Sequence, residues 1–199
     1  MARYGARLPL IAGPLITATG FFLFALPSLD GSYWLTFFPG FVVLGIGMAV
    51  SIAPLTTVVM NSVDLDRAGA ASGINNAVAR VAGVLAVAVL GIVMVEAFGL
   101  RLNESLAALH LSSNVFRDIQ SNLVKLGGLD VPSSVDEQTG AMIHAAIVQA
   151  FVFGFRFVMV LCAGLAVASA AVAARMIPST RGLLPAAFGK GAPPSGSVR

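Results

Sequence analysis

Four long runs of apolar residues constrain this chain more than any other feature of its sequence. They cover about residues 8–27, 34–60, 73–98 and 157–177, and the first two contain no charged residue. A helix that crosses the hydrocarbon core of a bilayer needs roughly 20 mainly apolar residues. The runs are continuous and do not alternate as the strands of a membrane barrel do. We therefore predict an all-α, polytopic membrane protein with four transmembrane helices.

The composition excludes a soluble globular fold. Of the 199 residues, 57% are hydrophobic and 11% are charged, and the mean hydropathy is +0.90. Soluble domains carry about 25% charged residues, so a water-exposed fold of this size could not cover itself with so few charges. The net charge of +3 is not gathered into a basic patch interleaved with aromatic residues, so we expect no nucleic-acid partner.

The sequence also lacks the residue patterns that enzymes and metal centres need. Cys162 is a single cysteine, and His110 and His144 lie too far apart in the sequence to form a metal-binding pair on one helix turn. No nucleophile, base and orienting group recur at a spacing that indicates catalysis. We expect no enzymatic activity, no metal site and no cofactor.

The first apolar run could instead be a cleavable signal peptide, and the early Arg3 and Arg7 suit either interpretation. However, the run is longer than the usual apolar core of a signal, and Pro14 interrupts it. The second run follows after a connection of a few residues. We therefore interpret the first run as a spanning helix.

Lysine and arginine placement predicts the orientation, because loops on the cytoplasmic side carry the excess of positive charge. With four spans, both termini lie on one side. The basic residues assigned to that side are Arg3, Arg7, Arg67, Arg175, Arg181, Lys190 and Arg199, whereas the other side holds Arg101, Arg117 and Lys125. The prediction is a multi-pass protein of the cell (plasma or inner) membrane with both termini cytoplasmic.

The chain divides into five predicted parts. These are a cytoplasmic loop (residues 1–7), three transmembrane helices (8–98), an extracytoplasmic loop with amphipathic helices (99–138), an extended helix that includes the fourth span (139–177), and a disordered cytoplasmic tail (178–199). In the loop, apolar residues recur every three or four positions, at Leu102, Leu106, Leu109, Phe116, Ile119, Leu123 and Leu126. The Gly127-Gly128 pair predicts a stop. Ser134 and Glu137 have the spacing of a capping box, which predicts the start of the extended helix.

Polar residues inside the second and third runs are the candidate functional residues. Pro54 removes a backbone donor and should bend the second helix. The hydroxyl and amide side chains around it either satisfy the bent backbone locally or line a wet cavity, as in transporters. Arg80 either reaches the cytoplasmic interface or contacts a substrate. The pathway candidates are Ser51, Pro54, Thr56, Thr57, Asn61, Asn75, Asn76 and Arg80.

The third run and the turn before it also carry small residues at spacings that favour close helix contact in membranes. They are Gly69, Gly73, Gly83 and Gly91. We predict helix packing for them, and the alternative is that this helix slides against a partner during a conformational cycle. Glu96 and Arg156 fall near the outer boundary, so no span carries a carboxylate at its middle.

Three stretches resemble the major facilitator superfamily. Arg3, Gly5 and Arg7 match its cytoplasmic loop pattern D-R-x-G-R-R, although Ala2 and Ala6 replace an acid and an arginine. The runs GIGMAVSIAPLTTVVM (residues 45–60) and AGAASGINNAVARVAGVLAVAVLG (residues 68–91) are similar to late helices of the fourteen-spanner drug:proton antiporter branch. The long loop before the last helix fits the same branch, so the resemblance covers nearly the whole chain.

The resemblance implies that the four spans are the last helices of the carboxy-terminal half of such a transporter. It places the second span at the central cavity and the third between the two halves. The expected function is a proton-coupled exporter of drugs or other small molecules that works by alternating access. The expected partners are the lipid bilayer, the missing amino-terminal half, a small-molecule substrate and protons. The chain would be a fragment, a truncated gene product or one piece of a split protein.

The alternative is an autonomous four-helix membrane protein that acts as a structural or assembly subunit. The sequence does not specify the substrate, the coupling ion or the oligomeric state.

Overall fold

The computed structural model describes residues 7–26, 33–61, 64–109, 111–132 and 134–176. Within these ranges the chain is helical and contains no strand. Its helices are α1 (Arg7–Ala25), α2 (Tyr33–Thr36), α3 (Phe38–Asn61), the 3-10 helix η1 (Leu65–Arg67), α4 (Ala68–Ala107), α5 (Ser113–Ser121), the 3-10 helix η2 (Leu123–Gly128) and α6 (Glu137–Met176). Helices α1, α3, α4 and α6 are long and apolar enough to cross a membrane. The predicted all-α membrane fold with four spans is confirmed.

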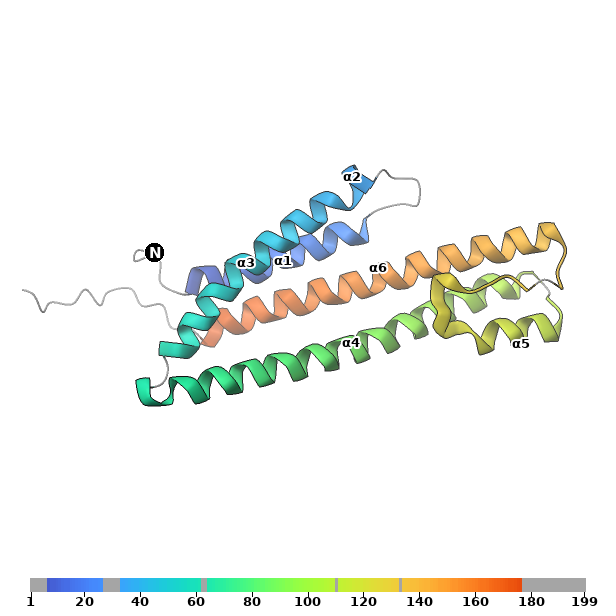
Figure 1. Cartoon of the computed structure of the whole chain (residues 1–199). Coiled ribbons are helices and arrows are strands. Elements are labelled where there is room, and N and C mark those ends of the chain that lie inside the picture. The colour runs from blue at the N-terminus through green and yellow to red at the C-terminus, as the bar shows by residue number, and fades with distance from the viewer. Residues whose placement is uncertain (1–6, 27–32, 62–63, 110, 133, 177–199) are drawn as a thin grey trace, which may run out of the picture.

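Helix α1 is the centre of one half of the molecule. It packs along α3 on one side and along the C-terminal part of α6 on the other (Figure 1). The short helix α2 precedes α3, and the two are separated at Phe37. The second apolar run was expected to be one helix from about residue 34. Instead, α3 begins at Phe38, which places Pro39 in its first turn. Backbone N–H groups in the first turn have no partner within the helix, so the missing N–H of proline costs no hydrogen bond there.

Helices α4 and α6 have 40 residues each, so each is about 60 Å long at 1.5 Å per residue. The hydrocarbon core of a bilayer is about 30 Å thick. Roughly half of each helix therefore extends beyond the membrane. The third apolar run was expected to end at Phe98, but the helix continues to Ala107 because Leu102 and Leu106 extend its buried face.

The projecting halves of α4 and α6 form a small packed unit with α5 and η2, at the end of the molecule far from α1 and α3 (Figure 1). We call it the distal unit (residues 97–150). Its core resembles that of a soluble helical domain, with large side chains that are almost fully buried. The core residues are Phe98, Leu102, Leu106, Val115, Ile119, Leu129, Ile143, Ala146, Ile147 and Ala150.

On α5, Val115 is buried, whereas Phe116, one of the apolar residues of the predicted amphipathic pattern, is exposed. One expectation for this region needs correction. At the start of α6, the cap is Asp136 and not Ser134, because the N–H of Thr139 donates to Oδ2 of Asp136 over 3.0 Å. The hydrogen bonds from Thr139 lower the pKa of the Asp136 carboxyl, since they favour its charged form. The helix therefore begins at Glu137, with a carboxylate at its positive end.

Candidate functional site

Helices α1 and α3 cross at very short distance. A Cβ added at Gly47 of α3 would lie 2.5 Å from both N and Oγ1 of Thr17, and one added at Gly20 of α1 would lie 2.8 Å from Cβ and N of Leu44. A Cβ added at Gly13 would collide with the hydroxyl oxygen of Ser51. Along these contacts the residue numbers rise on α1 as they fall on α3, so the two helices are antiparallel in one register. We call these six residues the α1–α3 seam.

Ser51 is therefore a contact residue between two helices. It is half-buried, and its Oγ donates to the carbonyl oxygen of Gly47 over 2.8 Å. One turn further on, Oγ1 of Thr56 donates to the carbonyl oxygen of Ile52 over 3.1 Å, and this side chain is exposed. Both hydroxyls donate to carbonyl groups of their own helix near Pro54. This agrees with the alternative in which these side chains satisfy the bent backbone locally. That they also line a pathway stays a prediction.

The remaining candidates divide between α3 and α4. The side chains of Thr57 and Asn61 lie outside the described residues. On α4, Asn75 is half-buried, whereas Asn76 and Arg80 are exposed. Since α3 ends at residue 61 and α4 begins at residue 68, Pro54 and Asn75 each lie about 10 Å along their helix from the connection between them.

The two candidate groups thus lie at the same end of the molecule, where α3 ends and α4 begins (Figure 1). The short connection between α3 and α4 holds these ends together, and both helices extend from it toward the other end of the molecule.

Helix α4 is uncovered over most of its apolar length. Every residue from Asn76 to Val89 is exposed. A Cβ added at any of the four predicted packing glycines, Gly69, Gly73, Gly83 and Gly91, meets nothing within 4 Å. The described residues therefore supply no neighbour for these glycines, and their role in packing stays a prediction.

The two faces of α4 nevertheless differ in the size of their side chains. Helical spacing puts bulky apolar residues on one face, at Ile74, Val78, Val81, Leu85 and Ile92. The opposite face carries small or polar residues, at Ser72, Asn76, Ala79, Gly83 and Ala86. Large apolar side chains suit lipid, and small ones suit a closely packed helix. The first four turns of α4 thus have the pattern of a helix with lipid on one side and a closely packed helix on the other, whereas further along Val87 and Leu90 lie on the small-residue face.

Arg7 has a structural role that the sequence did not reveal. Its Nη2 donates to the carbonyl oxygen of Ala174 over 2.8 Å, which places a positive charge at the C-terminal end of α6. Such a cation satisfies an unpaired carbonyl and the negative end of the helix dipole. The other residues of the predicted loop motif, Arg3 and Gly5, lie outside the described residues.

Fold and candidate residues together define a multi-pass, all-α membrane protein. In the part of the chain that the structure describes, no three His, Cys, Asp or Glu side chains are close enough to hold a metal ion.

Comparison with known proteins adds a more specific similarity. The chain is 31% identical over 99 residues to the tetracenomycin C resistance and export protein of Streptomyces glaucescens, which covers 50% of this chain and 18% of that protein. It is 34% identical over 94 residues to the multidrug resistance protein Stp of Mycobacterium tuberculosis, in the strains CDC 1551 / Oshkosh and ATCC 25618 / H37Rv, which covers 47% of this chain and 17% of that protein. The matches therefore span less than a fifth of the length of these curated relatives. No protein-family profile and no solved structure match the chain.

Proposed function

We propose that this chain provides four membrane helices of a small-molecule or multidrug exporter of the major facilitator type. The observation that carries the proposal is the similarity to two proteins named for export and drug resistance, which covers about half of the chain. The resemblance of residues 45–60 and 68–91 to the fourteen-spanner antiporter branch supports the same assignment.

The uncovered helix α4 supports the view that further helices complete the transporter. Its small-residue face around Asn76 and Gly83 is exposed in this chain. In a complete exporter, a helix from the other half would pack against this face, and the two halves would rock against each other. We infer that the chain lies in the cell membrane with both termini in the cytoplasm, as its lysine and arginine distribution predicts.

Proton coupling would then depend on an acid outside this chain. The spans of the chain carry no carboxylate near their middle, and Glu96 is an exposed residue near the distal unit. The polar residues of α3 and α4, with Asn75 foremost, would contribute contacts to the substrate. Because intramembrane polar residues are costly unless they have a role, Asn75 is the residue on which the assignment can be tested.

The test is drug efflux by the complete transporter that contains this chain, expressed in a strain without its own exporters. Asn75→Leu should lower the initial efflux rate about two- to thirteenfold, because a lost hydrogen bond costs about 0.5–1.5 kcal/mol. Val78→Leu, on the bulky face of the same helix, is the matched control and should leave efflux unchanged. Equal efflux by the two variants for every substrate would refute the assignment of Asn75 to the substrate pathway. No efflux by the unmodified transporter would refute the proposed export function.

A further inference from the structure

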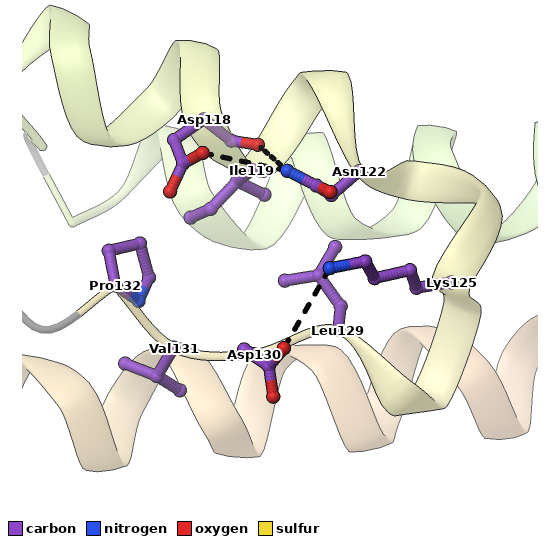
Figure 2. Close-up of a pocket in the computed structure, with 8 residues that line it drawn as sticks. All are labelled: Asp118, Ile119, Asn122, Lys125, Leu129, Asp130, Val131 and Pro132. Carbon is purple, nitrogen blue, oxygen red and sulfur yellow. Dashed lines mark hydrogen bonds and ion pairs between the residues drawn. The ribbon is translucent and has the colours of Figure 1, made fainter.

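The distal unit contains a cavity of about 190 Å³ between α5 and the extended segment that leads to α6 (Figure 2). It lies far from the candidate pathway residues, at the other end of the molecule (Figure 1). Its walls combine charged and apolar side chains. They are Asp118, Ile119, Asn122, Lys125, Leu129, Asp130, Val131 and Pro132.

The charges of the cavity are not balanced. Nζ of Lys125 lies 3.8 Å from Oδ2 of Asp130, so these two residues pair with each other. Asp118 has no ion pair among the described residues, and its Oδ1 accepts a long contact of 3.5 Å from Nδ2 of Asn122. In Figure 2, the Asp118 carboxylate and the Lys125–Asp130 pair lie on different sides of the cavity. Asp118 is exposed, and no ion pair among the described residues balances its negative charge.

The remaining wall residues are apolar. Ile119 and Leu129 are almost fully buried, with 1% and 6% of their surface exposed, and both belong to the core of the distal unit. Pro132 restricts the backbone beside them. Val131 and Pro132 are half-buried, and they give the apolar surface that a ligand in this space would meet beside the Asp118 carboxylate.

From these observations we propose that the cavity binds a small organic ammonium ion, with its positive group at Asp118 and its hydrocarbon part against Leu129, Val131 and Pro132. The volume limits the size of the ligand, since drug-sized molecules occupy sites of about 300–1,000 Å³. A charged group that hydrogen-bonds a carboxylate binds more strongly than a neutral one. The site is thus separate from the proposed export of larger molecules and does not depend on it.

The experiment uses the full chain in lipid nanodiscs, with isotope-labelled isoleucine, leucine and valine methyl groups. Titration with n-butylammonium chloride should shift the methyl resonances of Ile119, Leu129 and Val131 in a saturable manner, with a dissociation constant on the order of millimolar. Butyrate and n-butanol, which keep the hydrocarbon part but not the positive charge, should bind at least about tenfold more weakly.

Asp118→Asn should weaken butylammonium binding by about tenfold while the methyl spectrum of the free protein stays the same. Glu104→Gln is the matched control, because Glu104 is an exposed carboxylate of the same unit that pairs with Arg101 outside the cavity. The proposal is overturned if butylammonium gives no saturable shift, if butyrate or butanol binds equally well, or if Asp118→Asn binds as tightly as Glu104→Gln.

Discussion

Replacing Gly47 by alanine tests the α1–α3 seam directly. The added Cβ would lie 2.5 Å from N and Oγ1 of Thr17 and 2.9 Å from its Cα. Ordinary van der Waals contact begins near 3.4 Å. Because N and Cα belong to the backbone of α1, they cannot rotate away, so the two helices must separate by about 1 Å at this point, which loses dispersion contacts along the seam.

The expected cost follows from two opposing terms. Inserting a methyl group into a packed contact costs about 1–3 kcal/mol. Replacing glycine by alanine inside a helix gains up to about 1 kcal/mol in helix propensity. Gly45→Ala is the matched control, because it lies on the same helix and a Cβ there meets nothing within 4 Å. The propensity gain is common to both variants, so Gly47→Ala should be less stable than Gly45→Ala by about 1–3 kcal/mol.

The assay is reversible unfolding of the purified chain by sodium dodecyl sulfate in mixed micelles, followed by far-ultraviolet circular dichroism. We expect a lower unfolding midpoint for Gly47→Ala and an equal or higher midpoint for Gly45→Ala. If the free energies of unfolding of the two variants agree within about 0.5 kcal/mol, the helices do not approach as closely as the seam requires, and the reasoning fails.

Three further predictions concern other parts of the fold. Arg7→Gln removes the hydrogen bond to the carbonyl oxygen of Ala174, so amide hydrogen exchange should rise in the last turn of α6 and stay unchanged at its first turn. Asp136→Ala should increase exchange in the first turn of α6, and in the unmodified chain the same increase should appear as the pH falls below about 4. The sign follows from the lowered pKa of Asp136: the charged cap stabilises the helix above the ordinary pKa of an aspartate, and protonation removes this contribution. Ile147→Ala should destabilise the distal unit by about 2–5 kcal/mol, since Ile147 is 1% exposed, whereas Val124→Ala, at a side chain that is 75% exposed, should change the free energy of unfolding by less than about 0.5 kcal/mol.

The membrane-spanning helices could be predicted from the sequence because their signal is local. Hydropathy over a window of about 20 residues depends on neighbours in the chain alone. The same locality means that the sequence does not show how far a helix continues beyond its span. Polar residues after Phe98 indicated the end of a span, and the buried residues Leu102 and Leu106 continue the helix past that point through contacts with the distant helix α6. The residues of α6 that Leu102 and Leu106 contact lie far away in the sequence, so these contacts could not be predicted from it.

The helix contacts were harder to predict, because close packing depends on which helices meet. Gly69 and Gly73 are four positions apart and were predicted to pack against a helix, but a Cβ added at either residue meets nothing within 4 Å. The glycines that do allow close approach, Gly13 and Gly20 on α1 and Gly47 on α3, do not follow that spacing. Two antiparallel helices in a fixed register can use glycines two turns apart, and this register is a property of the pair and not of either sequence segment.

The sidedness of the chain is the most direct test of the account, because α4 must connect opposite faces of the membrane. Cys162 is replaced by serine, and single cysteines are introduced at Asp66, before α4, or at Val124, in the distal unit; both native side chains are exposed. In intact cells, a membrane-impermeant maleimide should label Val124→Cys at once and Asp66→Cys only after the membrane is permeabilised. Equal labelling of both variants in intact cells would place both sites on one side and contradict a chain that crosses the bilayer along α4.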